Sequence, residues 1–399
     1  MNEKSLIPSI RFAGFTDAWE RRKVEKLAIR VSSIGEQIGR PRVEYEDIIS
    51  GIGQLNKDIF SKVSNKPGIE FADGDVLYGK LRPYLKNWLL PNFNGLAVGD
   101  FWVLRPQNVD SKFLFRLIQS RKFEEVANQS AGTKMPRADW KLVSKTDFGT
   151  PLSAAEQRKL GSFFEALDSF ITLHQRKYEK LLNIKKSMLD KMFPKNDELF
   201  PEVRFAGFTD AWERRKLGEI ADKVTEKNSS RIYSETFTNS AENGIISQRD
   251  YFDHAVSNSA NLDGYYIVSE DDFVYNPRIS TTAPVGPINR NRLKSRGLMS
   301  PLYTVFRTRD IDALYLEHYF KSHHWHQYMF LNGDSGARSD RFSIKDFVFM
   351  EMPIAVPCKV EQMRIGSFLE ELDHLITLHQ RKLEKLQNIK KACLEKMFV

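Results

Sequence analysis

Two stretches of the chain place an apolar residue every 3.5 positions. From Leu160 to Met192, and again from Ile365 to Met397, the steps between these positions alternate between four and three residues. This spacing is typical of an α-helix that packs against another helix along a narrow seam. No glycine or proline interrupts either stretch after its second residue, so each predicts a helix of about 35 residues, or about 50 Å.

Isolated helices with such a seam need a partner, and the obvious partner of each is the other copy in the same chain. We therefore expect two long helices that form an antiparallel coiled coil. Polar residues on a seam set the register of a coiled coil at some cost in stability, and this is the role we expect for Lys185, Lys390 and the two seam histidines. The seam side chains expected at the contact are Leu167, Ile171, His174, Leu181, Leu372, Ile376, His379 and Leu386.

The segments that precede the helices have a different pattern, in which short aromatic and β-branched runs alternate with amphipathic runs. Residues 71–83 resemble residues 268–280, with Asp75 aligned to Asp272. Such runs, bounded by Gly, Pro, Asn and Asp, predict strands, whereas the periodicity of 111–128 predicts a helix. We expect two mixed α/β (α+β) bodies of one fold.

The chain is an internal repeat. RFAGFTDAWERRK occurs unchanged at 11–23 and at 204–216, and about 26 of the 38 residues of 156–193 recur at 361–398. Each half is thus a repeated head, a divergent body and a repeated tail, and common descent of the halves predicts a pseudo-twofold protein.

Two prolines and a charged middle mark a linker between the halves. The predicted boundaries are a head and first body at 1–152, a spacer helix at 153–193, the linker at 194–203, a second head and body at 204–357, and a C-terminal spacer helix at 358–399.

The formal net charge of +8 suits a polyanionic partner such as nucleic acid. The chain has only two cysteines, which favours a reducing compartment. The first ten residues lack a signal-peptide core, and no apolar run approaches the length of a membrane span. We expect a soluble, cytoplasmic protein without membrane contact.

Motifs for catalysis are weak. GDVLYGKL at 74–81 fits seven positions of a phosphate-binding loop, but Leu81 stands where Ser or Thr would bind magnesium. The histidines of EHYFKSHHWH at 317–326 lack zinc-site spacing, and a solvated or DNA-facing helix end is the favoured interpretation. No catalytic triad or carboxylate pair stands out. We therefore predict no catalytic residues, no metal site and no cofactor in this chain.

Basic, aromatic and amide residues are interleaved in both bodies. Arg and Lys pair with guanine, Asn with adenine, and all of them with phosphate. A solvated loop surface is the alternative for any single residue. The first body's candidates for DNA contact are Lys80, Arg82, Tyr84, Lys86, Asn87, Lys134 and Arg137. Those of the second body are Asn276, Arg278, Thr281, Arg290, Asn291, Arg292, Arg338 and Arg341.

The repeated AGFTDAWERRK head, the EQMRIGSFLEELDHLITLHQRK tail and its counterpart EQRKLGSFFEALDSFITLHQRK resemble those of the specificity subunits of type I restriction–modification systems. The resemblance covers essentially the whole chain. The segment FGTPLSAA at 148–155 departs from the family pattern found at 352–360 and leaves the junction of body and helix open.

The resemblance implies that each body is a target-recognition domain for one half of a split, asymmetric DNA site, and that the helices set the gap. It implies double-stranded DNA, two methyltransferase subunits and motor-nuclease subunits as partners. Catalysis would belong to those subunits, with S-adenosylmethionine for adenine methylation and ATP with Mg for the motor.

Two other classes share some of these features. A duplicated DNA-binding repressor or architectural protein accounts for the basic loops but not for identical heads and tails. A protein–protein scaffold accounts for the helices but gives the arginine and asparagine clusters no role.

Overall fold

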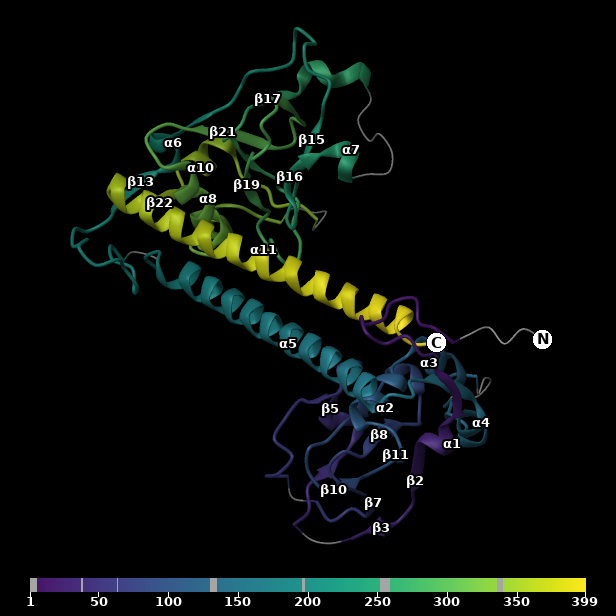
Figure 1. Cartoon of the computed structure of the whole chain (residues 1–399). Coiled ribbons are helices and arrows are strands. Elements are labelled where there is room, and N and C mark those ends of the chain that lie inside the picture. The colour runs from purple at the N-terminus through teal and green to yellow at the C-terminus, as the bar shows by residue number, and fades with distance from the viewer. Residues whose placement is uncertain are drawn as a thin grey trace. The chain divides into compact units, whose positions relative to one another are not determined.

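The chain forms two compact units (Figure 1). Unit 1 comprises Met1–Arg176 and His379–Val399, and unit 2 comprises Lys177–Leu378. Each unit holds one predicted body and a part of each long helix. The computed structural model describes residues 6–36, 39–62, 64–129, 135–195, 198–251, 259–335 and 340–399.

Unit 1 is a mixed α/β body. Its strands are β1 (Glu20–Lys23), β2 (Ala28–Val31), β3 (Ile34–Gly35), β4 (Arg42–Val43), β5 (Ile48–Ile49), β6 (Gln54–Leu55), β7 (Gly68–Phe71), β8 (Val76–Gly79), β9 (Trp88–Leu89), β10 (Gly95–Ala97), β11 (Phe101–Pro106) and β12 (Asp147–Thr150). Its short helices are α1 (Val24–Leu27), η1 (Tyr45–Asp47), η2 (Pro83–Leu85), α2 (Ser111–Leu117), α3 (Arg121–Ala127) and α4 (Trp140–Lys145). The strands form sheets in the orders β2-β11-β8-β9, β3-β7-β10-β4, β1-β12 and β5-β6.

Unit 2 has the same kind of body. Its strands are β13 (Glu213–Lys216), β14 (Ala221–Lys223), β15 (Phe237–Ser240), β16 (Gly244–Ser247), β17 (Tyr266–Val268), β18 (Phe273–Tyr275), β19 (Ile288–Arg290), β20 (Gly297–Met299), β21 (Thr304–Thr308) and β22 (Pro353–Val356). Its short helices are α6 (Leu217–Ile220), α7 (Gln248–Tyr251), η3 (Ser259–Gly264), α8 (Ala313–Lys321), α9 (His326–Asn332) and α10 (Asp346–Met350).

Each body has its own central sheet, and the two sheets have the same strand order. The order β14-β21-β18-β19 in unit 2 repeats β2-β11-β8-β9 in unit 1, and β13-β22 repeats β1-β12. Alternate residues of β8 enter two cores, Tyr78 on the side of α2 and Leu77 on the side of β7, as expected of a strand buried on both faces. In β18, Tyr275 and Val274 divide in the same way. The prediction of two mixed α/β bodies of one fold is confirmed.

The amphipathic stretch at 111–128 forms two helices where the sequence predicted one. α2 ends at Leu117, and α3 begins after Ser120, whose hydroxyl accepts a hydrogen bond from the Phe123 amide at 3.4 Å. A serine that caps a helix N-terminus competes with continuation of the preceding helix. The apolar spacing is the same on both sides of this break, so the periodicity alone did not reveal it.

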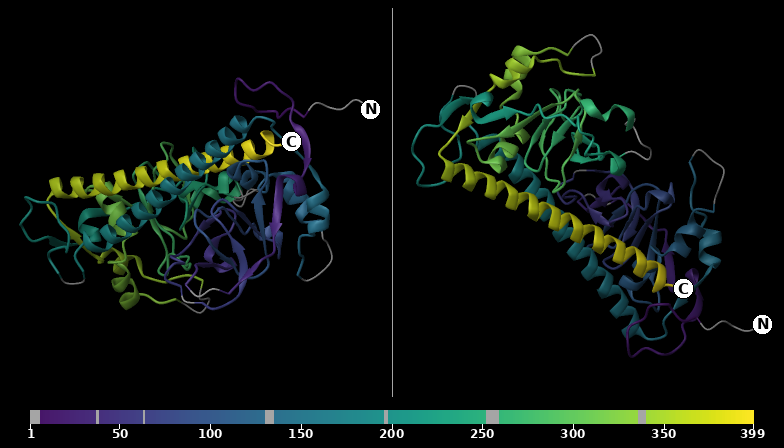
Figure 2. Two further views of the ribbon diagram at one scale, coloured as in Figure 1. Left: turned by 60° about the horizontal axis from the view of Figure 1, so that its bottom comes forward. Right: turned by 90° about the horizontal axis from the view of Figure 1, so that it is seen from above.

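The two long helices are α5 (Ala154–Lys191) and α11 (Lys359–Lys396), each of 38 residues. Within unit 1 they lie side by side and antiparallel (Figures 1 and 2). There Asp168 accepts from Lys390 at 2.7 Å, and the Nδ1 atoms of His174 and His379 lie 2.8 Å apart. In unit 2, Lys185 pairs with Asp373. The spacer helices are thus present as predicted, and each seam lysine pairs with an aspartate of the other helix.

The identical heads pack against the nearly identical tails. Arg11 of the first head donates two hydrogen bonds to Glu156 at the start of α5, at 2.7 and 2.8 Å. Arg204 of the second head makes the same bonds to Glu361 in α11, at the same distances. Both glutamates are buried. Repetition of the head is therefore explained in part by its contact with the repeated tail.

The ends of the long helices enter the two main cores. Phe398 packs edge-on against Trp19 of the first head, and Phe193 packs against Tyr315 of α8 in unit 2. All four side chains are buried. Within the described residues, no helix is long and apolar enough to cross a membrane.

Candidate nucleic-acid interface

In each unit, two loops that are far apart in the sequence are joined by a pair of backbone hydrogen bonds. In unit 1 the amide of Arg82 donates to Pro136 O at 2.8 Å, and the amide of Ala138 donates to Lys80 O at 2.8 Å. These bonds join the loop after β8 to the segment that precedes α4. Two of the predicted contact residues, Lys80 and Arg82, therefore lie next to a third, Arg137, which is remote in the sequence.

The same arrangement recurs in unit 2. The amide of Ile279 donates to Asp340 O at 3.1 Å, and the amide of Phe342 donates to Pro277 O at 2.7 Å. The backbones of Arg278 and Arg341 consequently form an isolated antiparallel β-bridge. Both bodies thus present a two-loop surface of one construction, although the loop sequences differ.

Arg82 is an exposed candidate cation of the unit 1 surface. Its side chain is exposed and has no ion pair within the described residues. Its backbone is left-handed, with φ of 49°, directly before the one-turn helix η2. Tyr84 follows and is 51% exposed. Lys80 and Arg137 both contact Asp100, at 3.5 and 3.1 Å, so one carboxylate holds these two cations beside Arg82.

Lys86 and Asn87 face away from this surface. Asn87 is buried, and its side-chain oxygen accepts a hydrogen bond from the Ser50 hydroxyl at 2.8 Å. Lys86 pairs with Glu124 at 2.8 Å. These contacts hold the turn after η2 against the body. The remaining candidate of this body, Lys134, lies outside the described residues.

In unit 2, Arg278 and Thr281 line a polar hollow of about 440 Å³. Both side chains are exposed. Asn276 also lines the hollow, but its amide group is used locally: Nδ2 donates to Asn239 O at 2.8 Å, and Oδ1 accepts from the Arg278 amide at 2.9 Å. Asn276 therefore orients the loop that carries Arg278.

The sequence analysis missed other residues that line this hollow. They come from the β15–β16 hairpin, from α7 and from the turn before β21, and they lack the basic clustering on which the prediction rested. They could have been found only from the proximity of the hairpin to residues 276–282. These residues are Ser240, Glu242, Tyr251 and Tyr303.

Three predicted contacts of unit 2 are engaged in bonds within the unit. Asn291 is fully buried and donates to Ser269 O at 2.8 Å. Arg290 bonds Glu317 at 2.7 Å, and Arg292 contacts both Glu317 and Glu370 of α11. These bonds fasten the body to the long helix. Arg338, also predicted, lies outside the described residues, and Arg341 is exposed.

The buried carboxylate at this junction remains charged. Burial raises the pKa of Glu317, but the charge of Lys321 and the hydrogen bond from Arg292 outweigh it, so the pKa lies below its ordinary value. A buried carboxylate with several cationic partners is a structural anchor.

The central sheets of both units contain an equivalent ion pair between an arginine and an aspartate. Arg105 of β11 forms a bidentate pair with Asp75 before β8, at 3.0 and 2.8 Å. Arg307 of β21 does the same with Asp272 before β18, at 2.6 and 2.9 Å. Both aspartates are buried. The sequence alignment of the two bodies predicted that these positions are equivalent.

His318, Glu370 and Asp373 bring three possible metal ligands within 4.8 Å of one another. His318 is fully buried, which contradicts a solvated or DNA-facing position for this residue. Glu370 pairs with Arg292, while Asp373 pairs with Lys185 and contacts Lys321 at 3.7 Å. Because cations already occupy both carboxylates, the cluster fits an ion-pair network and disfavours a metal ion.

Comparison with known proteins agrees with this architecture. Residues 209–388 match the family model described as the type I restriction modification DNA specificity domain. The matched residues include the second body and most of α11, and they make up less than half of the chain.

Two curated relatives are similar in sequence. The type I restriction enzyme EcoDI specificity subunit of Escherichia coli is 28% identical over 129 residues, which cover 31% of this chain and 29% of the relative. The type I restriction enzyme MjaVIII specificity subunit of Methanocaldococcus jannaschii is 24% identical over 71% of this chain and 68% of its own length. The alignment thus spans less than a third of the first relative.

A solved structure has a similar fold. The S subunit of a type I restriction–modification system from M. genitalium gives a TM-score of 0.58 at 13% identity, covering 98% of this chain and 99% of that one. Two domains with long spacer helices are therefore the shared architecture.

Proposed function

We propose that this chain is the DNA-recognition subunit of a type I restriction–modification complex, in which each body reads one half of a split, asymmetric DNA site. The carrying observation is the position of the exposed arginines. Arg82 and Arg278 lie on equivalent two-loop surfaces of bodies whose loop sequences differ. Two surfaces of the same backbone construction but different loop sequences are suited to recognise two different half-sites.

The chemistry of these surfaces suits base recognition. Exposed arginines donate two hydrogen bonds to guanine in the major groove, and hydroxyl and amide groups supplement them. The hollow beside Arg278 adds Thr281 and Ser240, and Glu242 offers an acceptor suited to the amino group of cytosine. In unit 1, Tyr84 and Arg137 flank Arg82 in a corresponding way.

The repeated helices suit a partner that is present twice. Phe170 and Leu173 of α5 are 54% and 46% exposed in unit 1, and Leu378, the repeat of Leu173, is 37% exposed in unit 2. A partner bound to each half of the chain would cover apolar side chains that are exposed at equivalent positions of the repeat. We assign them to two methyltransferase subunits, one for each half of the chain.

Catalysis in this proposal belongs to the partners. The methyltransferase subunits would use S-adenosylmethionine on adenine, and motor-nuclease subunits would use ATP with Mg. This chain contributes recognition, and its helices set the gap between the half-sites.

Salt dependence and partner dependence test the proposal. DNA binding by the chain with its methyltransferase subunits should weaken by about three to five orders of magnitude between 50 and 200 mM salt, as expected for six to ten phosphate contacts. A DNA affinity that does not change with salt concentration would instead favour the protein–protein scaffold. Full sequence-specific binding by the chain alone, without any complex with the methyltransferase, would contradict the proposed role.

A further inference from the structure

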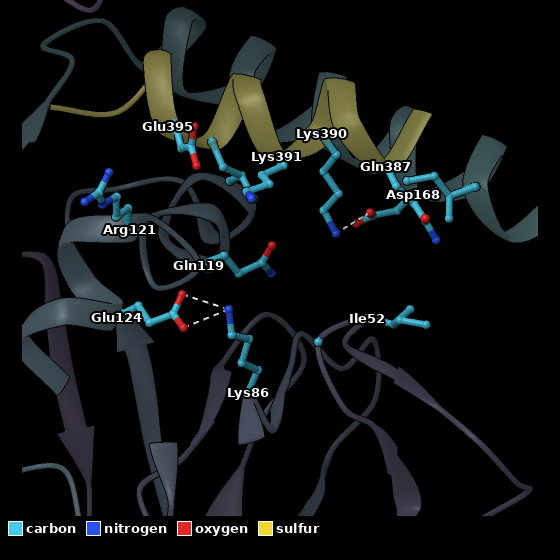
Figure 3. A pocket seen from close by; sticks show the side chains of 13 residues that line it. Ile52, Lys86, Gln119, Arg121, Glu124, Asp168, Gln387, Lys390, Lys391 and Glu395 are labelled. Atoms are coloured by element: carbon cyan, nitrogen blue, oxygen red, sulfur yellow. Dashed lines mark hydrogen bonds and ion pairs between the residues drawn. The ribbon is translucent and has the colours of Figure 1, made fainter. Parts of the chain in front are cut away.

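Each unit contains a hollow between one long helix and a turn that follows a short helix. In unit 1 the hollow is about 360 Å³ and lies between the C-terminal part of α11 and the turn that joins α2 to α3 (Figure 3). In unit 2 a hollow of about 660 Å³ lies between the C-terminal part of α5 and the end of α8.

The two hollows occupy equivalent positions of the internal repeat. Lys390 and Lys391 line the first, and Lys185 and Lys186, from the same NIKK motif, line the second. Gln119 in the first corresponds to Lys321 in the second. The duplication has therefore kept two lysines at both hollows although the bodies diverged, and the carboxylates of Glu124, Asp168 and Glu395 also line the first hollow.

The hollow of unit 1 presents hydrogen-bond donors. Gln119 is 6% exposed, its Oε1 accepts from Arg116 at 3.2 Å, and its Nε2 has no partner within the described residues. Lys391 is exposed and has no ion pair there, whereas Lys390 is held by Asp168. Figure 3 shows Lys391 reaching into the hollow from α11 and Gln119 on the opposite wall. Unsatisfied donors beside a free cation suit an anionic oxygen.

The hollow of unit 2 is more strongly basic. Lys185, Lys186 and Lys321 line it, with Asp190 as a carboxylate at its edge. Lys185 and Lys321 are held by carboxylates of the unit, whereas Lys186 is exposed without an ion pair in the described part of the chain. Lys186 and Lys391 are thus equivalent free cations.

We propose that each hollow binds a phosphate of the DNA backbone, with Lys391 and Gln119 as donors in unit 1 and Lys186 in unit 2. The inference rests on the DNA recognition proposed above. Phosphate contacts carry no base information and position a protein on the duplex, whereas base contacts specify. Phosphate ligands are therefore expected on the repeated helices, and base readers on the divergent bodies. In unit 1, Lys86 lines the hollow and directly follows η2, while Arg82 directly precedes η2, so this one-turn helix separates the hollow from the reading surface.

The test is a salt titration of DNA binding by the chain in complex with its methyltransferase subunits. The double variant Lys186→Ala, Lys391→Ala should reduce the slope of log K against log salt by about two, since each lost phosphate contact removes about 0.9. Affinity should fall equally for target and unrelated DNA, and the recognised motif should not change. Gln119→Glu, which keeps the acceptor for Arg116, should weaken binding further by placing a carboxylate beside the phosphate.

The matched control is Lys180→Ala, Lys385→Ala. These lysines are exposed, occupy equivalent positions on the same two helices and lie outside both hollows, so their removal should leave the slope unchanged. An unchanged slope in the Lys186, Lys391 variant would overturn the inference. So would weakened assembly with the methyltransferase at an unchanged slope, because the occupant would then be an acidic side chain of that partner. Failure of the wild-type complex to bind DNA would instead refute the proposed function.

Discussion

Arg82 and Arg278 are exposed arginines on equivalent surfaces of two different bodies, and each should affect one half-site only. Replacing Arg82 by Ala should cost about 1–3 kcal/mol of discrimination at one base of one half-site, as for the loss of a bidentate contact. Arg278→Ala should do the same in the other half-site. Competition binding with half-sites randomised one at a time measures both effects.

Arg82→Lys is the informative companion variant. Lysine keeps the charge but lacks the planar fork of arginine, so affinity should be largely kept while discrimination is lost. If Arg82→Ala alters neither half-site nor affinity, Arg82 is part of a solvated loop and does not read DNA.

The pairs that buried Asp75 forms with Arg105 and buried Asp272 forms with Arg307 should stabilise their units. Asp75→Ala removes both bonds to the guanidinium and the acceptor for the Ala72 amide, which should lower the free energy of unfolding by about 2 kcal/mol. Urea denaturation measures the loss. Asp73→Ala, at an exposed neighbouring position, is the control, and equal midpoints for the two variants would contradict this role.

The sequence did not separate the predicted arginines that are exposed from those that form ion pairs, for a physical reason. Arg82, Arg278 and Arg341 are exposed in the structure. Arg290 and Arg292 belong to the same kind of basic cluster but form ion pairs with Glu317. No local signal separates the two groups, because the competing carboxylate is remote in sequence and approaches only in the folded unit.

At the scale of elements, periodicity predicted the long helices well, because a 3.5-residue seam sustained over their length has one structural solution. It did not predict the break between α2 and α3, which depends on the single cap at Ser120. It also placed Lys185 and Lys390 on the seam without showing why they are tolerated there. The structure supplies the reason, since each has an aspartate partner across the helix pair.

Three histidines in and between α8 and α9 should make unit 2 less stable in acid. Burial lowers the pKa of His318, His324 and His326, in the last case to about 4. Between an unfolded pKa of about 6.5 and these lower values, the unfolded chain binds protons that the folded unit does not. The free energy of unfolding should therefore fall as the pH drops through this window.

Thermal unfolding at pH 7.5 and pH 5 measures this effect. His326→Gln should reduce the drop in melting temperature between the two pH values, because glutamine cannot be protonated there. An identical drop in wild type and variant would show that His326 does not contribute.

For the whole molecule, the repeat explains both what is constant and what varies. The heads hold the tails through Arg11 with Glu156 and Arg204 with Glu361, while the proposed reading surfaces lie on the bodies. If the helices set the gap, inserting four residues into both should lengthen the spacer by about 6 Å, close to two base-pair rises. The recognised gap should widen while both half-sites stay the same, and methylation mapping that shows altered half-sites would contradict this.

The most direct test of the central claim is to co-express this chain with a type I methyltransferase subunit from the same genome and to map methylated adenines by single-molecule sequencing. The account predicts a split, asymmetric motif that is methylated only when this chain is present, and Arg82→Ala and Arg278→Ala should each relax a different half of it. A continuous or symmetric motif, or methylation that does not depend on this chain, would contradict the claim that its two bodies read two different half-sites.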